Sequence, residues 1–157
     1  LATHWQSTFM ANYGTPGLLL TGGFGCTVTD SEGREYLDLL AGIAVSSIGH
    51  AHPALVDAVT AQVGRIAHTS NLYANPPSLA LGQRLQGLVP APSRVFLCND
   101  GATANEAALK IARKHGRAID PSGGKLDVVA VSGGFHGRTF GALAVTGQPG
   151  GCQCGQH

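Results

Sequence analysis

Residues 94–116 read RVFLCNDGATANEAALKIARKHG and decide the fold, because an apolar run, a glycine turn and a helical pattern follow one another. The apolar run at 94–98 has the length of a β-strand. Thr103 and Glu106 have the T-x-x-E spacing of a capping box, which predicts a helix start. Small apolar residues then recur on one helical face, and Gly116 is placed to end the helix. We expect a strand, a turn and a helix.

A second strand is predicted at 126–131, where the sequence is apolar and β-branched. Strand, helix and strand in this order predict a parallel pair joined by a right-handed crossover. The carboxyl ends of both strands then meet at one edge of the sheet, where ligands bind in open α/β folds. The loop at Gly101 and the segment 135–139, FHGRT, should therefore line one crevice.

These two loops favour an anionic ligand with an aromatic part. The N–H groups and the dipole at a helix N-terminus attract phosphate, although the P-loop lysine and the G-x-G-x-x-G pattern are both missing. Phe135 can stack on a planar ring, and Arg138 can bind a carboxylate through two hydrogen bonds. The alternative is plain scaffold, with Phe135 in the core and Arg138 in solvent.

The segment 99–106, NDGATANE, together with FHGRT, resembles the class III (ornithine-type) aminotransferases, which use pyridoxal phosphate (PLP). The resemblance runs from about residue 9 to residue 149 through shorter motifs at 13–16, 35–38, 42–45, 49–53, 70–73 and 143–149. It implies an incomplete α/β, fold-type I PLP-dependent transferase. Its parts would be a portion of the small domain at 1–70, the first β-α-β unit of the PLP-binding large domain at 71–149, and an aberrant tail at 150–157.

The resemblance also implies roles for individual residues. Gly101 and Ala102 would bind the cofactor phosphate through their backbone N–H groups. Phe135 would stack on the PLP ring with His136 next to it, and Arg138 would bind the substrate carboxylate.

Two positions depart from the family pattern, since Asp100 and Thr103 stand where Ser and Glu are usual. An ionised Asp100 would repel a phosphate dianion unless it turns away or caps the helix. No catalytic residue is expected among the 157 residues, because Lys110, Lys114 and Lys125 do not match the Schiff-base lysine of the family. That lysine is expected beyond residue 157, so the chain alone should be inactive.

The agreement is closest with the acetylornithine members of the family. It implies transfer of an amino group from N-acetylornithine to 2-oxoglutarate in arginine biosynthesis, by a homodimer. The expected location is the cytoplasm, because the sequence shows neither a secretory signal nor a long apolar run. Ornithine, succinylornithine and 4-aminobutyrate aminotransferases and glutamate semialdehyde aminomutase share both loops. A non-catalytic phosphate-binding or dimerisation module is the alternative from another class.

Composition argues against other partners. The net charge is +1 with no basic stripe, which disfavours nucleic acid. No long apolar run or secretory signal is present, so a membrane partner is not expected either. Cys26 and Cys98 are expected to be buried, and Cys152 and Cys154 lie in the tail. The pair His50 and His52 lacks a third ligand at suitable spacing, so we expect no metal.

The remaining elements follow from turn and helix signals. We expect an irregular arm at 1–16 and an antiparallel meander with strands near 18–21, 25–29 and 35–39. A helix from Pro53 to about residue 67 should cover the meander or meet the large domain, with an apolar seam of Val56, Val59, Val63 and Ile66. Another helix should follow 75–77 and stop at 90–92.

Overall fold

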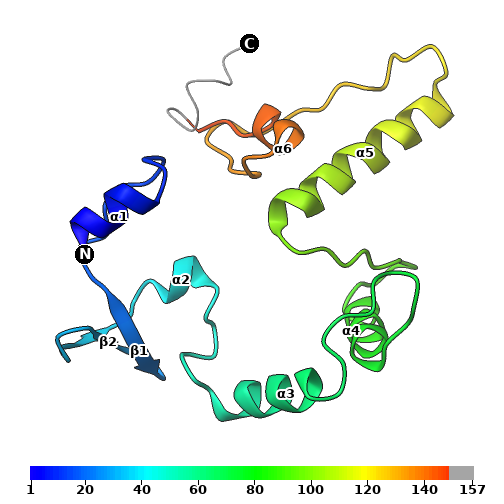
Figure 1. The fold of residues 1–157 in the computed structure, drawn as a ribbon. Helices are drawn as coiled ribbons and strands as arrows, with labels where there is room; N and C mark the ends of the chain where they lie inside the picture. The colour runs from blue at the N-terminus through cyan, green and yellow to red at the C-terminus, as the bar shows by residue number, and fades with distance from the viewer. Residues whose placement is uncertain (149–157) are drawn as a thin grey trace. The chain divides into compact units, whose positions relative to one another are not determined.

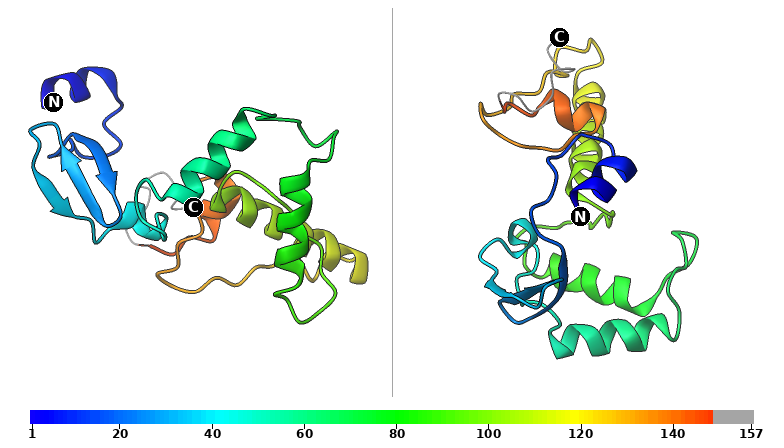
Figure 2. Two further views of the ribbon diagram at one scale, coloured as in Figure 1. Left: turned by 90° about the horizontal axis from the view of Figure 1, so that it is seen from below. Right: turned by 60° about the vertical axis from the view of Figure 1, so that its left-hand side comes forward.

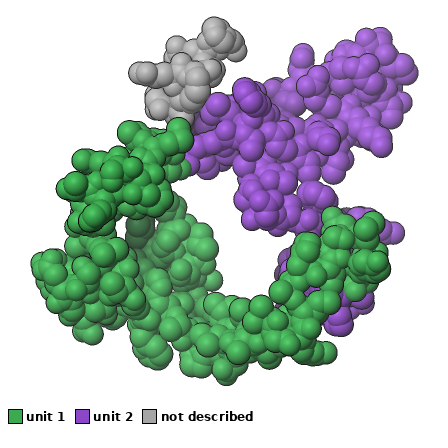
Figure 3. Space-filling view, viewed as in Figure 1, with its two compact units in different colours: residues 1–74 green, residues 75–157 purple. Residues whose placement is uncertain are grey.

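The computed structural model describes residues 1–148 (Figure 1). The predictions for Pro149, for the tail at 150–157 and for Cys152 and Cys154 lie outside these residues. The chain divides into two compact units, Leu1–Ala74 and a second unit that begins at Asn75 (Figure 3). The predicted domain division near residue 70 stays a prediction.

The first unit is built on the predicted antiparallel meander, which is confirmed (Figure 2). Its elements in chain order are α1 (Ala2–Thr8), β1 (Leu20–Phe24), β2 (Thr27–Asp30), β3 (Glu35–Leu37), α2 (Ala41–Ala44) and α3 (Pro53–Val63). The first turn differs from the prediction, because Gly22 and Gly23 pair within β1 with Thr29 and Val28. The chain reverses at Gly25 instead, whose φ of +57° suits glycine.

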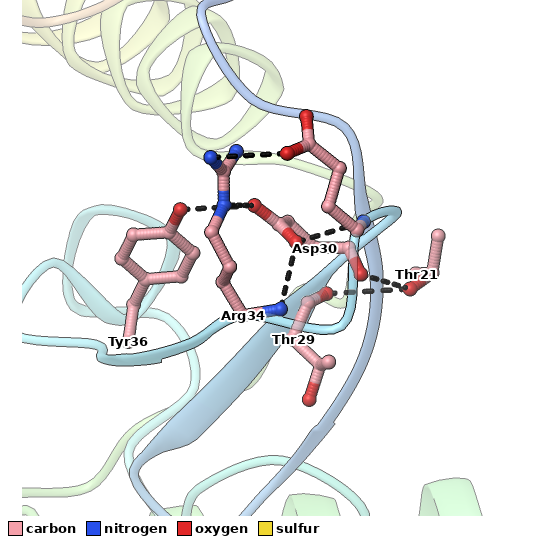
Figure 4. Close-up of polar contacts among 6 residues, drawn as sticks. Thr21, Thr29, Asp30, Arg34 and Tyr36 are labelled. Carbon is pink, nitrogen blue, oxygen red and sulfur yellow. Dashed lines mark hydrogen bonds and ion pairs between the residues drawn. The ribbon is translucent and has the colours of Figure 1, made fainter.

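Asp30 holds the turn between β2 and β3 together (Figure 4). Its side chain is buried and accepts hydrogen bonds from the backbone N–H groups of Glu32 and Arg34, both at 2.9 Å. It also accepts from the Arg34 guanidinium at 2.7 Å and from the Tyr36 hydroxyl at 2.9 Å. Burial opposes ionisation, but the bonds from Arg34, Tyr36 and Glu32 hold the pKa of Asp30 well below its ordinary value.

Two expectations for the first unit are wrong. The arm forms a helix, α1, in which the rings of Trp5 and Phe9 lie 4.4 Å apart, one turn from each other. The helix at Pro53 begins as predicted but ends at Val63, and the apolar seam does not cover the meander. Its side chains are between 47% and 59% exposed, because α3 packs on no other described element of the first unit. The alternative, that the seam meets the large domain, stays a prediction.

The second unit contains α4 (Pro76–Gln86), α5 (Gly101–Ile119) and α6 (Phe140–Ala144). Asn75 caps α4 by accepting a hydrogen bond from Ser78 N at 3.0 Å. Helix α6 was not expected from the sequence and lies beside α5 (Figures 1 and 2). Within residues 1–148, no helix combines the length and apolarity that crossing a membrane requires.

The parallel strand pair is not formed in residues 1–148. Segments 94–98 and 126–131 are not paired with each other or with another described segment. A segment of suitable composition becomes a strand only when its N–H and C=O groups meet those of a neighbour. Val129 is accordingly 97% exposed, and Cys98 is exposed rather than buried. Cys26, in the turn between β1 and β2, is also exposed and not buried as expected.

Both predicted ends of the central helix are also wrong. Helix α5 begins at Gly101 with Asp100 as the N-cap, so Thr103 and Glu106 form no capping box. It continues through Gly116 to Ile119. Gly116 is buried because the backbone of Lys125 passes so close that a Cβ would overlap its carbonyl group.

Candidate functional site

A pocket of about 620 Å³ lies between the start of α5 and the segment that precedes α6. It is lined by Asp100, Gly101, Ala102, Asn105, Phe135, His136, Gly137, Arg138 and Thr139. All five residues predicted to bind cofactor or substrate line this one pocket. They meet there although the two strands expected to deliver them are not paired. The volume lies in the range of pockets that bind small molecules.

The pocket wall at α5 contains a helix N-terminus that an acidic side chain already caps. Asp100 accepts hydrogen bonds from Thr103 N at 2.7 Å and from the Thr103 hydroxyl at 3.0 Å. These bonds hold the pKa of Asp100 below its ordinary value, so the carboxylate is charged near neutral pH. Of the two outcomes considered for this residue, capping of the helix is the one observed.

Side chains on both sides fix the backbone at His136. Asn105 on α5 donates a hydrogen bond to the carbonyl oxygen of His136 at 2.6 Å. The N–H of His136 donates to the Thr146 hydroxyl at 3.0 Å, and that hydroxyl lies 2.9 Å from the Ala142 carbonyl oxygen, to which it donates. Both backbone polar groups of His136 are therefore satisfied by side chains.

The segment containing the pocket residues belongs to a closed loop. Gly133 N donates to the carbonyl oxygen of Gly147 at 3.0 Å, and Gly147 N donates to that of Gly134 at 2.9 Å. Inside the loop, Gly137 is buried with a φ of +127°. A Cβ at this position would press into Ala102 and Ala142, so glycine permits the close approach of the loop to α5.

Phe135 and Arg138 interact with each other at the pocket. The guanidinium carbon of Arg138 lies 5.5 Å from the centre of the Phe135 ring, which is within the range of a cation–π contact. The Phe135 side chain is half exposed. An aromatic face and a cation that can bind a carboxylate are thus adjacent, next to the amide groups of the α5 N-terminus.

Sequence reasoning missed four residues of this region: Asn105, Glu106, Thr139 and Thr146. The capping-box spacing assigns Glu106 to a cap that does not form, and nothing in the sequence assigns Asn105 a partner. It accepts instead from the Thr139 hydroxyl at 2.6 Å and from Gly141 N at 2.8 Å. These bonds join positions more than thirty residues apart, which helical spacing does not reveal.

The two histidines considered as metal ligands have other partners in the first unit. His50 Nε2 lies 2.7 Å from Asp38 Oδ2. The His52 ring accepts from Ala54 N at 3.2 Å and caps α3. Their geometry is that of local structural contacts.

Comparison with known protein families and curated relatives gives one consistent result. A profile of the family described as Aminotransferase class-III matches residues 9–156. The acetylornithine aminotransferase of Mycolicibacterium smegmatis is 52% identical over 149 residues, covering 95% of this chain and 36% of that protein. That of Streptomyces coelicolor is 51% identical over 150 residues, covering 96% of this chain and 35% of the other. The chain spans about a third of the length of these curated relatives.

Solved structures agree with this assignment. The N-acetylornithine aminotransferase from Stenotrophomonas maltophilia is 40% identical with a TM-score of 0.67, over 76% of this chain and 31% of that chain. The omega transaminase from Pseudomonas jessenii in complex with PMP is 25% identical with a TM-score of 0.85, over 96% of this chain and 35% of that chain. The predicted family and fold class are confirmed: the chain belongs to the class-III aminotransferases and has part of their α/β, fold-type I architecture.

Proposed function

We propose that the pocket is part of a PLP site in an enzyme that transfers an amino group from N-acetylornithine to 2-oxoglutarate. The observation that supports this most is the convergence of Gly101, Ala102, Phe135 and Arg138 on one pocket. The names of the relatives at about 50% identity support the choice of N-acetylornithine as donor. A cytoplasmic location and a homodimeric state remain predictions.

The residues present fit PLP in shape and in most of their chemistry. Gly101 and Ala102 line the pocket in the first turn of α5, where backbone N–H groups can bind a phosphate, although the Ala102 N–H also interacts with the Asp100 carboxylate. Phe135 offers an apolar face to a pyridine ring. The close approach of Gly137 to Ala102 keeps the two walls within reach of one small molecule. Among the residues that line the pocket, only Asp100 carries a negative charge, which would repel a phosphate.

Each of these residues would have a binding or orienting role. Gly101 and Ala102 would hold the phosphate, and Phe135 would cover one face of the ring and exclude water from it. Arg138 would orient the carboxylate of the amino donor or of the oxo-acid acceptor. Bound PLP supplies an electron-withdrawing ring that stabilises negative charge on the substrate carbon. None of the three lysines lines the pocket, so we propose that this chain alone does not complete the reaction.

The experiment compares the isolated 157-residue chain with a polypeptide that extends it to the full length of the relatives. Both are incubated with PLP, N-acetylornithine and 2-oxoglutarate, and glutamate formation is measured. We expect glutamate from the extended protein and none from the chain alone. Preference of the extended protein for ornithine, succinylornithine or 4-aminobutyrate would overturn the assigned donor. Glutamate formed by the chain alone would overturn its proposed inactivity.

A further inference from the structure

Glu106 is the residue of α5 that contacts α6 most extensively through polar groups. Its Oε1 accepts from the Thr139 hydroxyl at 2.6 Å, from Gly141 N at 2.8 Å and from Ala142 N at 3.3 Å. The bond from Thr139, followed by those from Gly141 and Ala142, holds the pKa of Glu106 below its ordinary value. We call Glu106 and these three partners the Glu106 cluster.

The Glu106 carboxylate lies directly against Gly141. A Cβ at this position would overlap the carboxylate, so an alanine there would displace the end of the Glu106 side chain. Ala142, the next donor, has no exposed surface. α5 and α6 are also the only pair of elements in contact within the described part of the second unit. The Glu106 cluster therefore joins the two helices at the place where they pack.

The same cluster sets the position of the pocket loop. Thr139 both lines the pocket and donates to Glu106, and it directly follows Arg138. The opposite end of the loop is fixed at His136 by Asn105. Asn105 and Glu106 are neighbours on α5, so one helical turn holds both ends of the segment 136–139.

We infer that Glu106 is a positioning residue, which holds the Phe135–Thr139 segment at the distance from the α5 N-terminus that a phosphate-bearing ring requires. This inference rests on the proposed cofactor site. It assigns Glu106 no contact with the ligand, because Glu106 does not line the pocket. Its effect should fall on the ring-binding wall and leave the phosphate-binding wall unchanged.

The test uses the full chain labelled with ¹⁵N, as wild type, Glu106→Ala, Glu106→Gln, Gly141→Ala and the control Lys114→Ala. Lys114 lies about two turns further along α5 and is exposed. Two ligands are titrated: inorganic phosphate, and pyridoxine 5′-phosphate, which carries the ring but has no aldehyde to react with lysines. Amide hydrogen exchange at positions 141 and 142 is measured on the same samples.

In Glu106→Ala we expect exchange at 141 and 142 to accelerate by about tenfold or more, since bonds to a charged acceptor are lost. The affinity for pyridoxine 5′-phosphate should fall by about tenfold, toward that for phosphate, while phosphate affinity stays unchanged. Gly141→Ala should reproduce the ligand effect by displacing the carboxylate. Glu106→Gln, which keeps a carbonyl acceptor, should retain part of the amide protection and part of the affinity for pyridoxine 5′-phosphate. Lys114→Ala should match wild type.

Unchanged exchange at 141 and 142 in Glu106→Ala would overturn the inference, whatever the ligands do. Equal loss of both ligands would also overturn it, because it would indicate a general loss of structure. A different result would count against the cofactor site. In that case the amides at 141 and 142 are protected in wild type and lose protection in Glu106→Ala, but wild type binds neither ligand. The role of Glu106 in positioning a ligand then fails with that site, while the measured structural bond stands.

Discussion

The side chain of Asn105 donates a hydrogen bond at 2.6 Å to the carbonyl oxygen of His136, across 31 positions of the chain. This bond connects the helix that presents Gly101 and Ala102 to the loop that presents Phe135 and Arg138. The pocket therefore depends on side-chain contacts between α5 and the loop, since no strand pairing within residues 1–148 brings the two together.

Replacing Asn105 by Ala should lower the free energy of unfolding of the second unit by about 1 kcal/mol, because the carbonyl of His136 loses its partner. Urea unfolding followed by circular dichroism measures this change. Asn12→Ala, at an exposed position of the first unit, is the control and should leave the unfolding midpoint unchanged. Equal midpoints for Asn105→Ala and wild type would contradict the role given to this bond.

Replacing Gly137 by Ala should be more destabilising than replacing Gly133 by Ala. Both glycines have positive φ, at +127° and +77°. Only Gly137 has Ala102 and Ala142 in the way of a Cβ, whereas nothing lies near a Cβ at Gly133. We expect backbone strain of about 1–3 kcal/mol in each variant, and an added steric cost at Gly137. Urea unfolding that ranks the two variants in the opposite order would refute the close approach.

Removing the charge of Asp100 should strengthen phosphate binding. Asn and Ser cap helices about as well as Asp, so Asp100→Asn and Asp100→Ser keep the start of α5 while relieving repulsion between carboxylate and dianion. We expect affinity for inorganic phosphate to rise by about tenfold or more. Asp120→Asn, at the other end of the same helix, removes the same charge and should have no effect. Phosphate affinities that do not change in the Asp100 variants would show that Asp100 does not face the ligand.

The turn between β2 and β3 should lose stability in acid. The pKa of Asp30 is lowered in the folded chain, so its contribution is fully present above the ordinary value of 3.8 and declines as pH falls toward the lower folded value. Amide exchange at Glu32 and Arg34, measured between pH 6 and pH 2, should show protection decreasing below about pH 4. In Asp30→Asn this pH dependence should disappear, and in Tyr36→Phe it should weaken. A wild-type turn equally protected throughout would contradict the assignment.

The sequence predicted the meander, the starts of α3 and α4 and five of the residues that line the pocket, because these depend on local turn signals or on motif letters. It failed where a distant partner decides the outcome. Glu106 has the spacing of a capping box, yet its carboxylate binds the backbone beyond Thr139. Glycine often ends a helix, yet Gly116 lies inside α5, where the backbone of Lys125 passes close to it.

The two strands expected at 94–98 and 126–131 do not form in the described residues, for a related reason. Segments 94–98 and 126–131 have the right composition, but strand formation needs a hydrogen-bonded neighbour, and composition does not say which segment supplies it. Cys98 was expected in a buried strand and is exposed for the same reason. The side chains at the ends of these segments still meet, because α5 and its contacts with the loop position them.

The most direct test of the PLP site is a chemical-shift map of pyridoxine 5′-phosphate on the ¹⁵N-labelled chain. The proposal predicts that the amide signals of Gly101 and Ala102 and those of Phe135 to Arg138 move together with one dissociation constant, while the signals of β1 to β3 stay in place. Inorganic phosphate should move only the first group. Shifts confined to other parts of the chain, or shifts at Phe135 without shifts at Gly101 and Ala102, would contradict a single site that binds phosphate and ring together.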